Sequence, residues 1–83
     1  MDQLAEWKCH KVVNAGKIMF LSTNPRIAVI VEDRDGEPCN VIMPEGWSAR
    51  GMPGIGDYIV VYENGYKSWS PAKAFEDGYE RKP

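Results

Sequence analysis

The residues that could carry catalytic chemistry in this chain are few, because it has one histidine and two cysteines. A nucleophilic triad needs a nucleophile, His10 as the base, and an acid that orients the base. Cys9 is adjacent to His10, and adjacent residues of a strand point to opposite faces. Cys9, His10 and Cys39 also lack the paired spacing of a zinc site. We therefore expect no enzyme, no metal site and no cofactor.

The glycines of residues 44–56 have part of the spacing of a phosphate-binding loop. Gly51 and Gly56 match Gly-x-x-x-x-Gly, but Asp57 follows where that loop has lysine. The sequence therefore does not predict a loop that hydrolyses nucleotides. The backbone amides of Gly51, Gly54 and Gly56 can still form a nest for an anion. Plain turn geometry is the explanation that we favour for these glycines.

The aromatic and basic residues are more informative. The chain has three tryptophans and four tyrosines, and flat rings beside Lys or Arg stack on nucleotide bases. Tyr62, Lys67 and Trp69 have this chemistry, with Arg50 and Lys8 as phosphate partners. The alternative is that these rings belong to the core or to a subunit contact. We predict a ligand site formed by Lys8, His10, Trp47, Arg50, Tyr62, Lys67 and Trp69.

Size and charge limit the function classes. A chain of 83 residues forms a single domain over residues 1–83, with one small core. Ten basic against twelve acidic residues give a net charge of −2, which argues against a general nucleic-acid-coating protein. Residues 7–31 nevertheless carry only basic charges, whereas residues 32–37 are mostly acidic. A local basic surface that faces a phosphate is therefore an open alternative.

Neither a membrane span nor a signal peptide is expected. The longest apolar run, residues 27–31, is far shorter than the roughly 20 residues that a bilayer needs. The first seven residues are polar and acidic, unlike a signal peptide. We therefore expect a cytoplasmic protein with no membrane partner, in which Cys9 and Cys39 stay reduced. A disulfide between the two cysteines is the less favoured alternative.

The strongest hairpin signal lies in the second half of the chain. Residues 57–63 and 66–70 flank Asn64-Gly65, which indicates a two-residue type I′ turn. In that register Tyr62 faces Lys67, and Val60 faces Trp69. One face of the hairpin then carries Tyr58, Val60, Tyr62, Lys67 and Trp69.

The remaining sequence predicts further short strands and one helix. Expected strands cover residues 7–13, 17–21, 26–31 and 38–43, with turns at 14–16 and 33–36. Residues 44–56 are a loop, and a helix capped by Ser70 starts at Pro71 and runs to about Asp77. The expected fold is mainly β: a small antiparallel barrel or half-barrel, SH3-like, of about five strands with one short C-terminal helix. A flatter α+β sheet is the alternative.

Both ends of the chain contain specific sequence motifs. Residues 56–79 contain Gly-Asp-Tyr, Asn-Gly-Tyr-Lys-Ser and Ser-Pro-Ala-Lys-Ala-Phe-Glu-Asp-Gly-Tyr, and residues 7–13 read Trp-Lys-Cys-His-Lys-Val-Val. These segments resemble a widespread family of small uncharacterised bacteriophage and prophage proteins. Residues 21–55 depart from that family. The resemblance implies a phage accessory protein acting in the cytoplasm of an infected bacterial host, where such proteins often counter host defence.

The expected function follows from these observations together. We expect a non-catalytic binding protein that counters host defence by sequestering a nucleotide-type immune signal in a homo-oligomer. The aromatic and basic residues, the absence of a catalytic set and the small size favour it. Alternatives are an SH3-like or OB-like module that binds nucleic acid, and an inhibitor that binds a host protein through the acidic residues 32–37.

Overall fold

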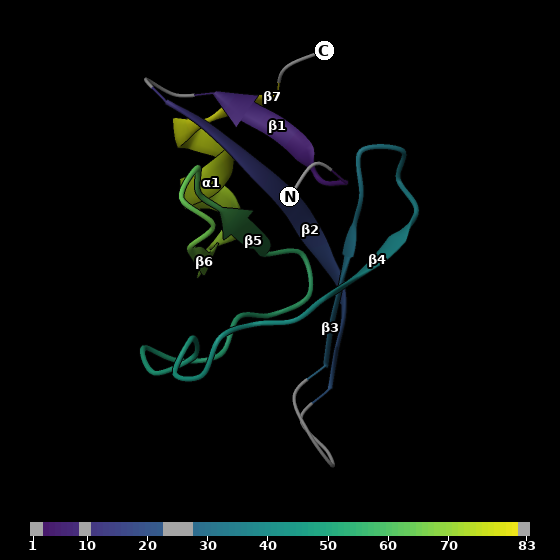
Figure 1. The fold of residues 1–83 in the computed structure, drawn as a ribbon, viewed down its shortest axis with the longest axis vertical. Helices are drawn as coiled ribbons and strands as arrows, with labels where there is room; N and C mark the ends of the chain where they lie inside the picture. Colours follow the sequence, from purple (N-terminus) through teal and green to yellow (C-terminus); the bar gives the residue numbers. More distant parts are fainter. Residues whose placement is uncertain (1–2, 9–10, 23–27, 82–83) are drawn as a thin grey trace.

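A computed structural model describes residues 3–8, 11–22 and 28–81, which form a curled antiparallel half-barrel with one short helix (Figure 1). This confirms the expected fold class, with seven strands in place of about five. No helix in these ranges is long and apolar enough to cross a membrane. The elements are β1 (Ala5–Lys8), β2 (Val12–Ser22), β3 (Ala28–Glu32), β4 (Pro38–Val41), β5 (Tyr58–Val61), β6 (Lys67–Ser70), α1 (Ala72–Gly78) and β7 (Glu80–Arg81).

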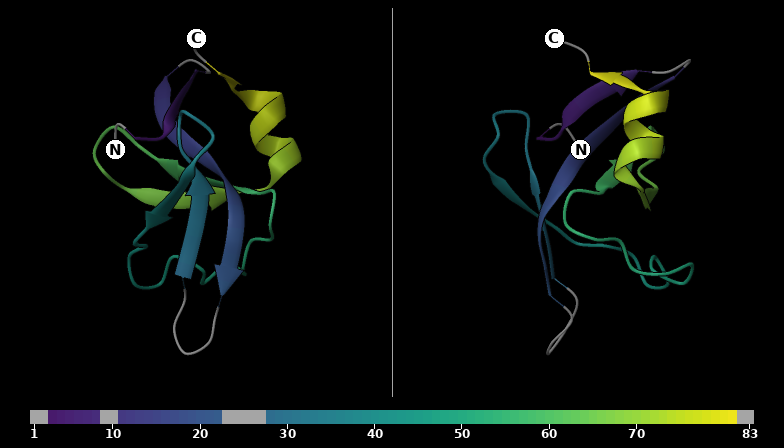
Figure 2. Two further views of the ribbon diagram at one scale, coloured as in Figure 1. Left: turned by 90° about the vertical axis from the view of Figure 1, so that its right-hand side faces the viewer. Right: turned by 180° about the vertical axis from the view of Figure 1, so that it is seen from behind.

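Strand β2 connects the two halves of the sheet. Its first part pairs with β1 on one side and β5 on the other, and its last part pairs with β3. Strand β4 continues the sheet beyond β3, β6 pairs with β5, and β7 pairs with β1. Figure 2 shows β2 curving along its length, so that the β3–β4 hairpin and the β5–β6 hairpin diverge from it.

Gly16 lies where β2 has no room for a side chain. The predicted turn at residues 14–16 is wrong, because β2 continues through them and the chain reverses between β1 and β2 instead. A Cβ atom on Gly16 would lie 2.5 Å from the backbone oxygen of Glu32 and 2.8 Å from Cγ2 of Val31. Glycine at this position therefore lets β3 approach β2 closely, where β2 passes from one set of partners to the other.

Strand β5 is buried on both faces and divides the core into two clusters. Ile59 and Val61 belong to one cluster, and Tyr58 and Val60 to the other, as the alternation of a strand requires. Helix α1 covers the second cluster with Phe75, which is 1% exposed. The first cluster contains Leu4, Ile18, Val29, Val31, Val41, Ile59 and Val61.

A hydrogen-bonded tyrosine fixes the helix to the sheet. The hydroxyl of Tyr58 donates to Oε2 of Glu76 at 2.6 Å, and Nζ of Lys17 lies 3.6 Å from the same oxygen. Burial, followed by the bond to Glu76, raises the pKa of Tyr58 well above its usual range. Tyr58 therefore keeps its proton and remains a donor to the helix at alkaline pH.

The start of the helix is capped from outside the helix. The predicted helix is present but lies one residue later, at Ala72–Gly78, and the predicted cap is wrong, because Pro71 is the N-cap residue and the Ser70 hydroxyl donates to the oxygen of Pro71 at 3.5 Å. Oδ1 of Asp57 accepts the amide of Ala72 at 2.9 Å, and Oδ2 accepts the amide of Gly54 at 2.8 Å. A carboxylate that precedes β5 thus performs the capping and ties residues 44–56 to the helix.

The turn between β3 and β4 confirms its prediction. Gly36 has a φ of 79°, and the amide of Asp33 donates to the oxygen of Glu37 at 2.8 Å. Oδ1 of Asp33 also accepts the amides of Asp35 and Glu37 at 2.9 Å each. The side chain of Asp33 therefore stabilises its own turn.

The turn between β5 and β6 differs from its prediction by one residue. A type I′ turn needs positive φ at both Asn64 and Gly65, but only Gly65 has it, at 88°. The amide of Tyr62 instead donates to the oxygen of Tyr66 at 2.8 Å, which closes a three-residue loop. In the resulting register Val61 lies opposite Lys67, and Ile59 lies opposite Trp69.

Candidate functional site

The one-residue shift separates the predicted ligand residues. Side chains on one face of a hairpin alternate, so Lys67 and Trp69 lie on the face of Ile59 and Val61. Tyr62 packs against the other cluster, on the opposite face. The prediction that Tyr62, Lys67 and Trp69 share a face is therefore wrong.

Trp69 and Arg50 nevertheless meet, as the predicted site requires. Nη2 of Arg50 donates to the backbone oxygen of Trp69 at 3.3 Å, and its guanidinium carbon lies 5.6 Å from the centre of the Trp69 ring. The ring also packs against the first cluster, and its Nε1 is buried with no partner among the described residues. Arg50 and residues of the first cluster thus pack around the Trp69 ring. This arrangement favours a packing role for Trp69.

Trp47 and Lys67 line a shared hollow on this face of the hairpin. The hollow has a volume of about 380 Å³. Nζ of Lys67 donates to the backbone oxygen of Ile42 at 2.7 Å, so β6 is joined to the residue that follows β4. We call this hollow, with its walls of Ile42, Met43, Trp47, Tyr66 and Lys67, the tryptophan groove.

Of the seven predicted ligand residues, only Trp47 and Lys67 line this groove. Lys8 is exposed on β1, opposite Val12 and Glu80. His10 lies outside the described residues. The structure therefore gathers four of the seven predicted residues on one side of the hairpin: Trp47, Arg50, Lys67 and Trp69.

The anion nest, the less favoured explanation of the glycines in residues 44–56, is not formed. The amide of Gly51 donates to the oxygen of Ser48 at 2.9 Å, and the amide of Gly56 donates to the oxygen of Ile18 at 2.9 Å. The amide of Gly54 is taken by Asp57. All three donors are satisfied within the protein, so turn geometry, the favoured explanation, accounts for these glycines.

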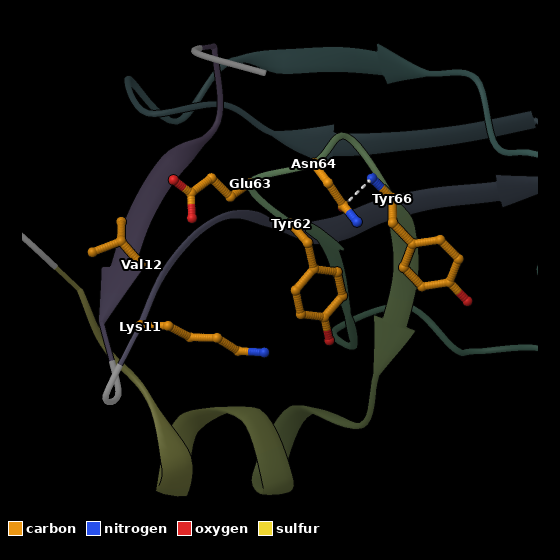
Figure 3. Close-up of a pocket in the computed structure, with 6 residues that line it drawn as sticks. All are labelled: Lys11, Val12, Tyr62, Glu63, Asn64 and Tyr66. Atoms are coloured by element: carbon orange, nitrogen blue, oxygen red, sulfur yellow. Dashed lines mark hydrogen bonds between the residues drawn. The ribbon is translucent and has the colours of Figure 1, made fainter.

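A second hollow lies on the opposite face of the β5–β6 hairpin (Figure 3). Its volume is about 470 Å³. The ring centres of Tyr62 and Tyr66 are 5.9 Å apart with 30° between their planes, and Nζ of Lys11 lies 4.7 Å from the Tyr62 ring centre. We call this hollow, lined by Lys11, Val12, Tyr62, Glu63, Asn64 and Tyr66, the tyrosine pocket.

Besides the two tyrosines, the tyrosine pocket contains three polar side chains, those of Lys11, Glu63 and Asn64. Oδ1 of Asn64 accepts the amide of Tyr66 at 3.0 Å, which holds the asparagine against the turn. Within the described ranges, neither Lys11 nor Glu63 forms an ion pair. The pocket thus offers an ammonium, a carboxylate and an amide beside two aromatic rings.

The sequence-based site missed Lys11, Glu63, Asn64 and Tyr66. The error comes from the assumed two-residue turn, which placed Lys67 beside Tyr62. The signal for the correct register was available in Glu63-Asn64-Gly65 followed by tyrosine, because a type I turn ending in a left-handed glycine is the usual three-residue hairpin loop.

No family model matches this chain, and comparison with curated proteins and with solved structures finds no match. The resemblance to small phage proteins therefore depends on the terminal segments quoted above.

Proposed function

We propose that this chain is a non-catalytic binding protein that holds a nucleotide-type ligand in the tyrosine pocket. The observation that carries the proposal is the ammonium of Lys11, 4.7 Å from the Tyr62 ring centre, with the Tyr66 ring 5.9 Å further on. Aromatic rings beside a cation are the elements that bind a base and its phosphate.

The chemistry of the pocket fits such a ligand. Tyr66 is 61% exposed, so its ring is accessible for stacking. Lys11 has three N–H donors and, among the described residues, no carboxylate partner. A phosphate on the ligand would supply the negative charge that pairs with the Lys11 ammonium. The volume of about 470 Å³ lies within the range of small-molecule sites.

The biological role in this proposal is sequestration. The chain would bind an immune signal of the infected bacterium and hold it unmodified, as the likeness of its terminal segments to small phage proteins suggests. Assembly of several copies, also part of the proposal, would give a chain of 83 residues further buried surface. The site of action would be the host cytoplasm.

The test is titration calorimetry of the purified protein with AMP, GMP, CMP and UMP, with native mass spectrometry to read the assembly and the bound mass. We expect Lys11→Gln and Tyr62→Ala to weaken binding about tenfold each. Lys73→Gln is the matched control, because this lysine is 90% exposed on α1. Binding that is unaffected by Lys11→Gln and Tyr62→Ala contradicts the site. Recovery of a hydrolysed ligand contradicts sequestration.

A host protein is the second candidate partner, and the tryptophan groove favours it. Ile42 is 84% exposed beside Trp47, and an exposed large apolar patch marks an interaction surface. In this case Ile42→Asp should abolish co-purification of a host protein with the tagged chain. Val12→Asp, on the opposite face of the hairpin, should not. Equal capture by both variants contradicts this candidate.

A further inference from the structure

One exposed apolar side chain is a wall of two neighbouring hollows. Ile42 directly follows β4 and is 84% exposed, whereas its neighbour Val41 is buried in the first cluster. Ile42 lines the tryptophan groove and also a further hollow of about 570 Å³. We call this further hollow, with its walls of Ala28, Val29, Val41, Met43, Trp47 and Ser48, the valine hollow. Ile42 is therefore an apolar projection with a largely apolar hollow beside it.

The backbone at Ile42 is held in place from another strand. Nζ of Lys67 donates to the backbone oxygen of Ile42 at 2.7 Å, which joins this residue to β6. Figure 1 shows the chain crossing, after β4, to the side of the molecule that holds β5 and β6. The side chain of isoleucine is itself stiff, because two heavy atoms on Cβ restrict its first torsion angle. A partner that covers Ile42 therefore has little conformational entropy to remove.

Charged side chains of both signs accompany these apolar features. Glu45 is exposed and lines both the tryptophan groove and the valine hollow. Lys67 and Arg50 each donate to a backbone oxygen, those of Ile42 and Trp69. In the part of the chain that the structure describes, none of these three charged side chains forms an ion pair. The face thus contains a projection, a hollow, a carboxylate and two cations.

We infer that this face is a twofold interface between two copies of the chain, in which Ile42 of each copy fills the valine hollow of the other. A twofold interface must be complementary to itself, because the same patch lies on both copies and each contact occurs twice. An apolar projection beside an apolar hollow meets that requirement. Charged groups of both signs meet it as well, since the carboxylate of one copy can approach a cation of the other.

A second copy fits these observations better than an unrelated partner. An unrelated partner would need only a cavity for Ile42 or a side chain for the valine hollow, so it does not explain why both features lie together. The inference rests on the assembly that is part of the proposed function, and it names the surface for that assembly. It also places the contact on the face of the β5–β6 hairpin opposite the tyrosine pocket.

The first test is sedimentation equilibrium of the purified protein without nucleotide. We expect a dimer whose dissociation constant rises about thirtyfold or more in Ile42→Asp, the effect of a central interface residue. Ile55→Asp is the matched control, because Ile55 is 71% exposed and lines neither hollow. Circular dichroism checks the fold, which a change at either exposed position should preserve. A monomeric unaltered protein, or an equal effect of both variants, overturns the inference.

Mixing two variants tests whether the contact is reciprocal. Ser48→Trp fills the valine hollow but keeps Ile42, whereas Ile42→Asp keeps the hollow open. A mixed dimer then retains one intact contact, whereas a dimer of either variant alone retains none. We expect native mass spectrometry of the mixture to show more of the mixed dimer than of both variants' own dimers together. A mixture without this excess overturns the insertion of Ile42 into the valine hollow.

The outcomes separate this inference from the proposed nucleotide site. A monomer that binds nucleotide overturns the interface and leaves the tyrosine pocket as the ligand site. A dimer that binds no nucleotide supports the interface and overturns the nucleotide site. A host protein that binds a monomeric chain, and is lost with Ile42→Asp, overturns the inference and assigns this face to the second candidate partner.

Discussion

The side chain of Lys67 donates to the backbone oxygen of Ile42 at 2.7 Å, although 25 residues separate them in the chain. This bond crosses the open side of the half-barrel, where β4 and β6 are not paired with each other. Arg50 makes a comparable bond to the oxygen of Trp69 on β6. Two cationic side chains thus satisfy carbonyl groups at the sheet edge, where a barrel would have a strand pair.

Lys67→Met should destabilise the fold without affecting the tyrosine pocket. The loss of a charged hydrogen bond to a carbonyl should lower the free energy of unfolding by about 1 kcal/mol. Urea denaturation measures this change, and GMP titration should give the affinity of the unaltered protein. A variant that keeps full stability but loses nucleotide binding would move the ligand site to the tryptophan groove.

Gly16→Ala should be strongly destabilising. The added Cβ would lie 2.5 Å from the backbone oxygen of Glu32, so β2 and β3 must separate. We expect a loss of about 2 kcal/mol or more in the free energy of unfolding. Gly78→Ala is the control, because no atom lies within 4 Å of its added Cβ. Equal thermal unfolding temperatures for the two variants would show that Gly16 is not a packing constraint.

Asp57→Ala should release both the helix start and residues 44–56. It removes the acceptor of the Ala72 amide and of the Gly54 amide together. The expected cost is about 1–2 kcal/mol, in the range for a lost helix cap. Hydrogen exchange should accelerate at the amides of Ala72 and Gly54, while the amides of the β3–β4 turn keep their protection. Uniform acceleration would instead indicate global destabilisation.

Tyr58→Phe should change how stability depends on pH at the alkaline end. The pKa of Tyr58 is raised in the folded state, so the folded form keeps a proton that the unfolded chain loses above its ordinary pKa of about 10. The stabilising contribution of Tyr58 is complete below about pH 10 and decreases above it.

Urea denaturation between pH 8 and pH 11 tests this. At pH 8 Tyr58→Phe should be about 1 kcal/mol less stable, because the bond to Glu76 is lost. The difference between the two proteins should shrink as the pH rises above 10. A difference that stays constant would show that Tyr58 does not titrate between the folded and unfolded states.

Local patterns predicted the elements of this fold better than their registers. The β3–β4 turn and the helix were predictable because Gly36 and Pro71, which directly precedes the helix, act within a few residues. The cap by Asp57 was not, because it joins positions 15 residues apart. Gly16 was read as a turn residue, since its close contact with β3 exists only after the sheet has formed.

The prediction of the candidate site was affected most by the error in the β5–β6 register. Moving the β5–β6 pairing by one residue transferred Lys67 and Trp69 to the opposite face from Tyr62. The prediction that Lys67 is the cationic neighbour of Tyr62 is wrong, because the ammonium that lies over the Tyr62 ring is that of Lys11. Sequence spacing alone does not show which lysine crosses from another strand.

Tyr66 stands between the two hollows, since it lines both the tyrosine pocket and the tryptophan groove. A ligand that fixes the orientation of this ring in one hollow also sets a wall of the other. If ligands occupy both hollows, their binding would then be thermodynamically linked, and each would change the affinity of the other by the same factor. A protein that captures a small molecule on one side of this hairpin would thereby report that capture to whatever binds on the other side.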